Sequence, residues 1–390
     1  MTASDLCSDV ARNFRLATGG THSVAAYAPG RIEVLGNHTD YNEGFVLSAA
    51  INMGIAFLAA PSPDTTCRVY DAKFKDEVTF DVRSPTPSPQ KPWANYIKGV
   101  LSGLQKHGRT DRGFSALVQG DIPIGAGLSS SAALEIASGL ALCELYGIRL
   151  DSLDLARIAQ AAEHTFVGVK CGLLDQISSL YGREEHVVMC DFRSLHVEAL
   201  PTGADACFLM CNTRVKHALV DGEYNERRAR CEEAAACFAR VLPHPVRALR
   251  DVSWDEWQRF APGMDPVTAR RAAHIIGENR RVSEGKRLLE GGDLEAFGRL
   301  MFESHASSRD NFENSCAELD TLVDAASRIP GIMGARLSGG GFGGSAIALA
   351  HRRDAEVAGQ ALASAYARTY GHPAEVQAII PSAGARLLKP

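Results

Sequence analysis

Residues 120–135 constrain the fold more than any other stretch, because a strand end, a glycine-rich loop and a helix follow one another without interruption. The stretch reads G-D-I-P-I-G-A-G-L-S-S-S-A-A-L-E. Glycines let a backbone approach a bulky anion, and the first turn of a helix presents unpaired N–H groups at the positive end of its dipole. Serine hydroxyls can cap those groups or ligate a cation that a phosphate carries. The pattern indicates a phosphate-binding loop, with a tight turn before a buried, capped helix as the alternative.

The size and charge of the chain narrow the class of protein. Its 390 residues give room for two domains, and 45% hydrophobic with 22% charged residues is typical of a soluble globular enzyme. The formal net charge of -5 gives no electrostatic reason to expect nucleic acid or an anionic membrane as a partner. We therefore expect a small-molecule partner, with any nucleotide held by local geometry.

The N-terminal segment and the cysteines bear on where in the cell the protein is located. Residues 1–20 predict a short amphipathic helix without the apolar core of a signal peptide, and no apolar run reaches the ~20 residues that span a bilayer. The ten cysteines include no C-x-x-C pair, and several lie in apolar runs, as buried reduced thiols do. We expect a cytoplasmic protein without a membrane segment, and we expect a monomer.

A second polar segment runs from Arg31 to Asn42. Residues 23–28 predict a short strand that ends at the turn signal Pro29-Gly30, and the next residues alternate as R-I-E-V-L. If these form a strand, Arg31 and Glu33 share one face. The density of charged and hydrogen-bonding groups exceeds what a solvated turn requires, although an exposed strand and loop is the simpler interpretation.

Two carboxylates lie in apolar surroundings further along the chain. Glu163 lies near the end of a helix predicted over residues 150–165, and Asp175 stands alone in V-K-C-G-L-L-D-Q-I-S-S-L-Y. A carboxylate among apolar neighbours costs free energy unless it is paired. From the residues alone, Asp175 is therefore either hydrogen-bonded structure or a catalytic group.

The last glycine-rich segment is R-L-S-G-G-G-F-G-G-S-A-I-A-L-A, residues 336–350. Its glycines formally fit G-x-G-x-x-G, but a dinucleotide fingerprint opens a helix, whereas residues 345–350 alternate as a strand does. We expect two strands joined by a glycine loop. The chain contains no G-x-x-x-x-G-K-[ST] sequence.

Together these segments resemble a known family. A-P-G-R-I-E-V-L-G-N-H-T-D-Y-N-E-G (28–44), I-G-A-G-L-S-S-S-A-A-L-E (124–135) and R-L-S-G-G-G-F-G-G (336–344) are similar to the three motifs of the GHMP small-molecule kinases, and within them to galactokinases. The resemblance implies an α/β (α+β) GHMP fold in which mixed sheets are flanked by helices. It implies two domains, 1–200 and 201–390, with the active site in the cleft between them.

The resemblance also implies roles for individual residues, with ATP and Mg²⁺ as the cofactors. Asp175 matches the catalytic carboxylate, Arg31 the cation beside it, and Ser131 and Glu163 the magnesium ligands. The phosphates of ATP would be contacted by Gly125, Ala126, Gly127, Leu128, Ser129, Ser130, Ser131, Gly340 and Gly341. The sugar would be contacted by Glu33, Asn37, His38, Asp40, Gly172 and Tyr224. Three segments far apart in the sequence would then meet at one cleft.

The match departs from the family at two positions. The first motif usually reads G-R-x-N-x-x-G-E-H-x-D-Y, and here Glu33 and Asn37 have exchanged residue types. Galactokinases use the glutamate at the position of Asn37 to contact the C6 hydroxyl. Asparagine can still bond a hydroxyl, but loss of the charge removes a repulsion against a C6 carboxylate. Glu33 can restore that charge nearby, or compete with Asp175 for Arg31.

We therefore expect ATP-dependent phosphorylation of a monosaccharide at its C1 hydroxyl, with galactose as the substrate. Two related sugars, galacturonate and N-acetylgalactosamine, are the alternatives. A catalytically silent sugar and ATP sensor is a further alternative, which intact Arg31, Ser131, Glu163 and Asp175 disfavour. His38, Asp40 and Tyr41 disfavour a mevalonate or homoserine kinase.

Overall fold

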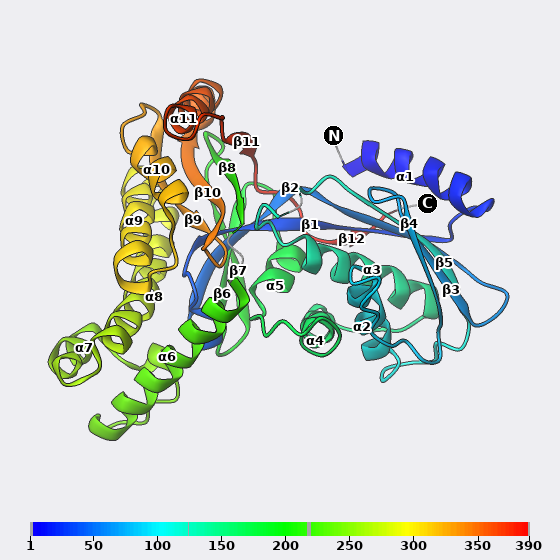
Figure 1. Cartoon of the computed structure of the whole chain (residues 1–390), viewed down its shortest axis with the longest axis horizontal. Coiled ribbons are helices and arrows are strands. Elements are labelled where there is room, and N and C mark those ends of the chain that lie inside the picture. The colour runs from blue at the N-terminus through cyan, green and yellow to red at the C-terminus, as the bar shows by residue number, and fades with distance from the viewer. Residues whose placement is uncertain (1–2, 124, 217–219, 389–390) are drawn as a thin grey trace.

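A computed structural model describes residues 3–123, 125–216 and 220–388, which form two sheets flanked by helices (Figure 1). Ile124, which opens the glycine-serine motif, and residues 217–219 lie outside the described residues. The first sheet has eight strands, with β12-β1-β2-β5-β3-β4 in order and β6 and β7 joined to it through β2. The second sheet has four, in the order β11-β8-β10-β9. No helix in these ranges is long and apolar enough to cross a membrane.

Strand β2, Phe45–Pro61, pairs with three other strands of the first sheet. It pairs antiparallel with β1, Val24–Leu35, along most of its length. On its other edge, its first residues pair with β6 and its last residues with β5. The remaining strands of this sheet are β3 Thr66–Asp71, β4 Asp76–Asp81, β5 Phe114–Gly120, β6 His186–Asp191, β7 His196–Pro201 and β12 Arg386–Leu387.

Helices cover both faces of the first sheet, which explains why β2 is apolar at almost every position. Successive side chains of a strand point to opposite faces. Ala56 and Leu58 accordingly pack with Phe14 of α1, whereas Phe57 joins the core on the other face. Figure 1 shows α1 on one side of this sheet and α2 to α5 on the other. These helices are α1 Ala3–Thr18, α2 Ala94–Leu104, α3 Ser130–Tyr146, α4 Ser152–Ala162 and α5 Leu174–Tyr181.

The second sheet packs between helices α10 and α11 on one face and the rest of the chain on the other. Leu209 and Ala348 join the cluster formed with α10 and α11, whereas Met210 and Ile347 join the core shared with the first sheet. Its strands are β8 Ala206–Lys216, β9 Ile332–Ser338, β10 Gly343–His351 and β11 Glu375–Ile379. The helices of this half are α6 Val220–Val241, α7 Trp254–Phe260, α8 Pro266–Glu290, α9 Leu294–Ser307, α10 Ala317–Ala326 and α11 Ala355–Tyr370.

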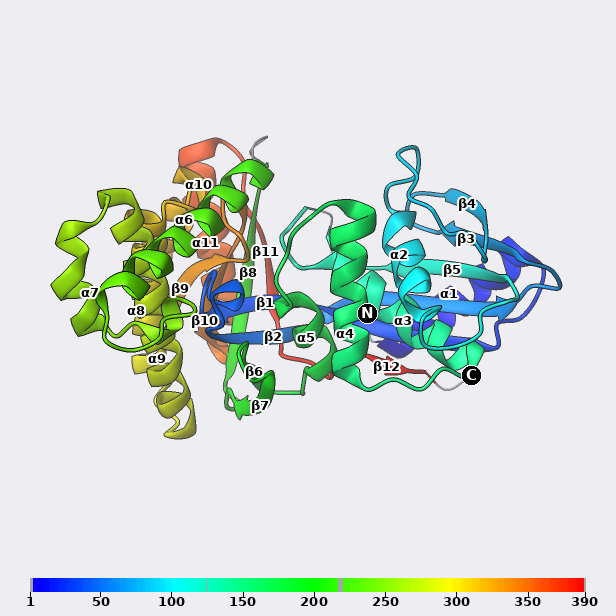
Figure 2. The ribbon, with the colours of Figure 1, turned by 90° about the horizontal axis from the view of Figure 1, so that it is seen from below.

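The two sheets meet where β1 reaches β9, close to the loop between β9 and β10 (Figure 2). The Glu33 backbone N–H donates to Ser338 Oγ at 2.9 Å. The expected hairpin is present, because β9 and β10 pair antiparallel around residues 339–342. The change of sheet between β7 and β8 coincides with the boundary expected near residue 200, although β12 returns to the first sheet. The domain limits themselves stay a prediction.

Two local predictions need correction, and one strand was missed. Pro29-Gly30 is not a turn, because β1 continues through it with a register shift against β2. A Cβ on Gly30 would lie 2.5 Å from Leu128 O, so the glycine permits close contact with the loop before α3. The helix expected over 150–165 ends at Ala162 and continues as a π turn over Glu163–Val167. Strand β7 was not expected.

Candidate active site

A cavity lies at the junction of the two sheets, where residues from five segments meet. Most of its lining comes from β1 and the turn that follows it, from the segment before α5, from α5 itself, from the second turn of α6 and from the β9–β10 loop. The predicted residues among its lining are Arg31, Glu33, Asn37, His38, Asp40, Gly172, Asp175, Tyr224 and Gly340. The structure thus brings together most of the predicted sugar-contacting and catalytic residues.

Asp175 lies in the first turn of α5 and is held by two of the predicted motifs. Arg31 Nε donates to Asp175 Oδ1 at 2.8 Å, and Arg31 Nη2 lies 2.7 Å from the same oxygen. Ser129 Oγ donates to Asp175 Oδ2 at 2.6 Å. Ser129 is the N-cap residue of α3, yet its hydroxyl makes no capping bond and bonds the carboxylate instead. The carboxylate is therefore fixed between a guanidinium and the start of the predicted phosphate loop.

The loop itself is shaped by residues in the left-handed region. Gly125, Gly127 and Ser129 have φ of 75°, 71° and 57°, and α3 begins at Ser130. Arg31 holds this loop too, because its Nη1 donates to Gly127 O at 2.7 Å and its backbone N–H to Leu128 O at 3.1 Å. The second sheet holds it from the other side, since Ser345 Oγ donates to Ala126 O at 2.7 Å. The loop is thus fixed beside Asp175.

A hollow separate from this cavity lies next to Ser130 and Ser131, at the start of α3. Its walls include the rings of Phe74, Trp93 and Tyr96, together with Lys73. Lys73 Nζ donates to Ile122 O at 2.9 Å, just before the loop. Of its lining, sequence reasoning assigned a role only to Ser130 and Ser131; it missed the aromatic residues, although aromatic residues near a nucleotide loop are a usable signal.

Behind the loop lie three carboxylates, those of Glu135, Glu163 and Asp175. Burial, with the charge of Asp175 added, raises the pKa of Glu163 to about 7, against the lowering effect of the neighbouring Ser131 hydroxyl. Burial and the nearby Glu163 raise the pKa of Glu135 well above its usual value. Gln176 Nε2 donates to both, at 3.1 Å to Glu135 Oε2 and 3.2 Å to Glu163 Oε1. Glu135 Oε1 has no partner among the described residues.

His38 and Asp40 also line the cavity. His38 has φ of 62°, and its Nε2 lies 3.1 Å from Gly340 O, so that Nε2 donates and Nδ1 accepts from Tyr41 Oη at 2.8 Å. Burial lowers the pKa of His38 to about 4, which keeps the ring neutral. Burial raises the pKa of Asp40 to about 7. A Cβ on Gly172 would overlap the Asp40 carboxylate, so only glycine permits this arrangement.

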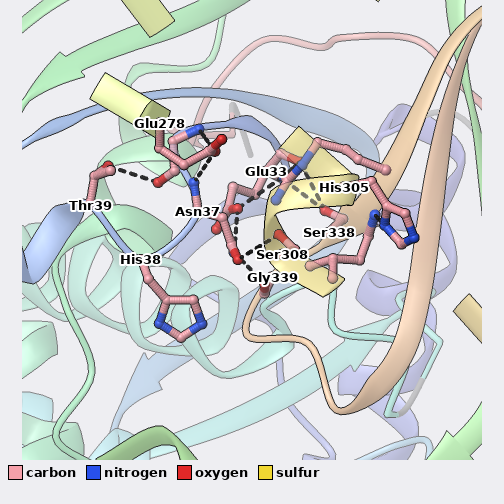
Figure 3. A network of polar contacts seen from close by, with 12 residues as sticks. Glu33, Asn37, His38, Thr39, Glu278, His305, Ser308, Ser338 and Gly339 are labelled. Carbon is pink, nitrogen blue, oxygen red and sulfur yellow. Dashed lines mark hydrogen bonds and ion pairs between the residues drawn. The ribbon is translucent and has the colours of Figure 1, made fainter. Parts of the chain in front are cut away.

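Glu33 and Asn37, which lie next to each other in Figure 3, form one buried unit with Arg336. Asn37 Nδ2 donates to Glu33 Oε1 and to Gly339 O, both at 2.8 Å. Arg336 Nη1 lies 3.0 Å from Glu33 Oε1. The expectation that Glu33 competes with Asp175 for Arg31 is therefore wrong, because Glu33 has Arg336 as its hydrogen-bonded cation. The expectation that Glu33 restores negative charge beside Asn37 agrees with this geometry.

Sequence reasoning assigned no role to Arg336, Asn314 or Glu278. Arg336 is fully buried, and Asn314 Nδ2 donates to Asn37 Oδ1 at 2.8 Å. Glu278 accepts from the backbone of Asn37. A usable signal existed for Arg336, which stands between Ala335 and Leu337 in an otherwise apolar strand. Glu278 and Asn314 lie in helical or irregular polar stretches that look like solvated surface.

The fold and the site together define a small-molecule kinase of the GHMP class. Residues 95–183 match the GHMP kinases N terminal domain and residues 286–368 match the GHMP kinases C terminal domain. Residues 12–61 match the galactokinase galactose-binding signature. The mevalonate kinase fold is also similar, with a TM-score of 0.63 at 16% identity over 92% of this chain and 100% of that one, which shows a shared fold alone.

The particular family follows from similar full-length proteins. The galactokinase of Chloroflexus aurantiacus is 41% identical over 92% of each chain, and that of Haemophilus influenzae strain PittEE is 38% identical over 94% of this chain and 95% of the relative. The crystal structure of Lactococcus lactis galactokinase complexed with galactose superposes with a TM-score of 0.93 at 32% identity, over 98% of this chain and 100% of that one. The chain belongs to the galactokinase family, which confirms the predicted kinase class and fold.

Proposed function

We propose that this chain transfers the γ-phosphoryl group of ATP to the C1 hydroxyl of galactose. The observation that carries the proposal is Asp175, held by Arg31 and Ser129 where the phosphate loop meets the cavity. Phosphoryl transfer passes through a loose transition state, so catalysis depends mostly on positioning and charge stabilisation. A carboxylate at this point can accept the proton of the attacking hydroxyl or anchor the charges around it.

In this proposal Arg31 and the loop act on the phosphoryl group. Arg31 contacts both Asp175 and Gly127 O, so the guanidinium lies between the base and the loop. There it can pair with the Asp175 carboxylate and face the charge that develops on the phosphoryl oxygens. The N–H groups of the first turn of α3, with residues 125–131, would hold the phosphates. The aromatic hollow beside Ser130 and Ser131 suits a nucleotide base.

Magnesium fits the residues present. No group of three or more His, Cys, Asp or Glu side chains in the described ranges could hold a metal, but Mg²⁺ usually takes one or two carboxylates plus water and substrate phosphates. Glu163 and Ser131 offer such an oxygen pair, and Glu135, whose Oε1 has no partner among the described residues, lies near Glu163. The ion would neutralise charge between the phosphates.

For the sugar, the arrangement favours galactose over galacturonate. Glu33 places a carboxyl group within hydrogen-bond distance of Asn37, so the acidic group that the exchange of residue types seemed to remove is retained. Burial raises the pKa of Glu33, and Arg336 and Arg31 oppose that rise. A C6 carboxylate would meet this acidic group, whereas a C6 hydroxyl can donate to it. Asp40, with its two acceptor oxygens, suits adjacent ring hydroxyls, and its geometry depends on Gly172. The cytoplasmic location and the monomeric state expected from the sequence stay predictions.

The test is ADP release with galactose, galacturonate, N-acetylgalactosamine and glucose, each with ATP and Mg²⁺. We expect turnover with galactose and at least about a hundredfold lower kcat/KM with galacturonate, the size expected when a buried charge is left facing a like charge. Turnover on none of the four sugars would overturn the proposal. A catalytically silent sensor would release no ADP but would still bind galactose and ATP. Calorimetric binding measurements distinguish such a sensor from an inactive preparation.

A further inference from the structure

Helix α8 contacts the backbone of the predicted sugar motif directly, although it starts more than 220 residues later in the chain. His274 and Glu278 are four residues apart and therefore lie on the same face of the helix. Both side chains are fully buried. Neither belongs to the described residues that line the cavity. A buried carboxylate and a buried imidazole outside the cavity require another explanation.

Both side chains contact the peptide units around Asn37, and Figure 3 shows Glu278 beside Asn37. Glu278 Oε2 accepts from the backbone N–H groups of Gly36 and Asn37, each at 2.8 Å. His274 Nε2 lies 3.2 Å from Asn37 O and must donate to it, since a carbonyl oxygen only accepts. The peptide units on both sides of Asn37 are thus held by one helix.

The Glu278 carboxylate is also kept ionised. Burial alone would raise its pKa, but the Arg281 guanidinium, whose Nε donates to Glu278 Oε1 at 2.6 Å, and the Asn37 N–H lower it below the usual range. A hydrogen bond from an amide to a charged acceptor is stronger than one to a neutral acceptor. The Glu278 carboxylate therefore remains a charged acceptor for the two N–H groups across the neutral pH range.

The segment held by these hydrogen bonds has a strained backbone. His38 follows Asn37 directly and has φ of 62°, a conformation that a residue with a side chain adopts only when its surroundings enforce it. The imidazole of His38 reaches the cavity from this position, as does the amide of Asn37. Fixing the peptides around Asn37 therefore fixes the direction of two side chains predicted to contact the sugar.

We propose that Glu278 is a positioning residue for the sugar, which acts through the backbone of Gly36 and Asn37 without touching the substrate. The inference rests on the proposed sugar kinase function. It assigns Glu278 to sugar binding and not to nucleotide binding. Apart from Arg281 on its own helix, its hydrogen-bond partners lie in the sugar motif, and none of them lies in the loop over residues 125–131.

The first experiment compares Glu278→Gln with the wild type and with Glu284→Gln, a partly exposed residue of the same helix that pairs with Arg287. Loss of hydrogen bonds to a charged group corresponds to about a tenfold effect or more. We expect Glu278→Gln to raise the galactose KM by about tenfold or more and the ATP KM by less than about twofold. Glu284→Gln should change neither. Folded Glu278→Gln with an unchanged galactose KM, or with equal rises in both KM values, would overturn the proposal.

A second variant and a second measurement cover the other outcomes. If Glu278→Gln does not fold, Arg281→Lys keeps the cation but loses the Nε–H bond to Glu278, and we expect a rise in galactose KM of about threefold. Hydrogen exchange at the amides of Gly36 and Asn37 needs no substrate, so it tests the hydrogen bonds to Glu278 even if wild-type turnover on galactose fails. We expect faster exchange at these two amides in Glu278→Gln and in Arg281→Lys. Unchanged exchange in both variants would overturn the role of Glu278 but would not contradict the proposed kinase activity.

Discussion

At the sugar end of the cavity, residues 33–38 are held by side chains from distant parts of the chain, whereas at the phosphate end three carboxylates lie close together with few donors. Asn37 has partners for its side-chain amide and for both of its backbone groups. Glu135 and Glu163 share the single amide group of Gln176, and one oxygen of Glu135 has no partner in the described part of the chain.

The difference indicates two ways of preparing a site. The sugar end is organised before any ligand binds, so little conformational entropy is lost when galactose enters. At the phosphate end, burial and the neighbouring carboxylates raise the pKa values of Glu135 and Glu163, so these groups need a cation or a proton to balance their charge. We therefore expect changes at the sugar end to alter affinity or stability, and changes at the phosphate end to alter turnover and its dependence on metal and pH.

The largest effect is expected at Asp175, where the two ends meet. Asp175→Asn keeps the shape of the side chain but removes the charge and the proton acceptor, so kcat should fall by about a thousandfold. The galactose KM should change little, because Gly172, Asp40 and His38 are untouched. Steady-state kinetics on a variant that keeps the wild-type circular dichroism spectrum measures this. A variant retaining more than about a tenth of wild-type kcat would remove Asp175 from the chemistry.

The next effect tests whether Glu33 and Asn37 act as one unit. Glu33→Asn leaves Arg336 buried without a compensating charge, and Asn37→Glu brings a second carboxylate next to Glu33. Each single change should lower the free energy of unfolding by about 3 kcal/mol. The double variant carries one carboxylate and one amide again, so it should recover at least about half of that loss.

Urea unfolding of the four proteins in this cycle measures the coupling. Additive losses in the double variant would show that the two residues are independent, and that the exchange of residue types has no structural compensation. The same four proteins, assayed with galactose and galacturonate, show whether the carboxylate excludes the acidic sugar from either position.

This pair also shows where sequence reasoning stops. The alternation R-I-E-V-L correctly placed Arg31 and Glu33 on one face of β1, and strand alternation identified the β9–β10 hairpin. Which cation Glu33 meets depends on Arg336, 303 residues later, and no local pattern contains that information. The same holds for Glu278, whose partners are 242 and 241 residues away.

The shape of the predicted phosphate loop was easier to foresee than the contacts of the predicted sugar residues, for a physical reason. Its glycines, its serines and the helix that follows are contiguous, so local backbone preferences already specify its shape. Pro29-Gly30 is the counterexample, because tertiary contact with Leu128 keeps in the strand a dipeptide that favours a turn.

A smaller effect is expected from Gly172→Ala, which probes the fit at the sugar end. The added methyl group would overlap the Asp40 carboxylate and displace it. We expect the galactose KM to rise by about tenfold, the effect of losing one hydrogen bond to a charged group, with the ATP KM unchanged. Gly263→Ala, where an added Cβ meets nothing within 4 Å, is the matched control. A Gly172→Ala variant with the wild-type galactose KM would show that Asp40 is not constrained as the geometry indicates.

The smallest effect is a pH dependence of the metal requirement, and it probes the phosphate end. The pKa of Glu163 is raised to about 7, so the carboxyl is mostly protonated below that pH, and a proton must leave before a cation binds. The Mg²⁺ concentration for half-maximal turnover should therefore rise by about tenfold from pH ~8 to pH ~6 and level off above the pKa. Glu163→Gln, assayed in parallel, carries the same contribution from ATP protonation but lacks the titrating carboxyl. A wild type that shows no steeper pH dependence than Glu163→Gln would mean that Glu163 does not hold the ion, and the charge of the carboxylates at this end would then have to be balanced by protons alone.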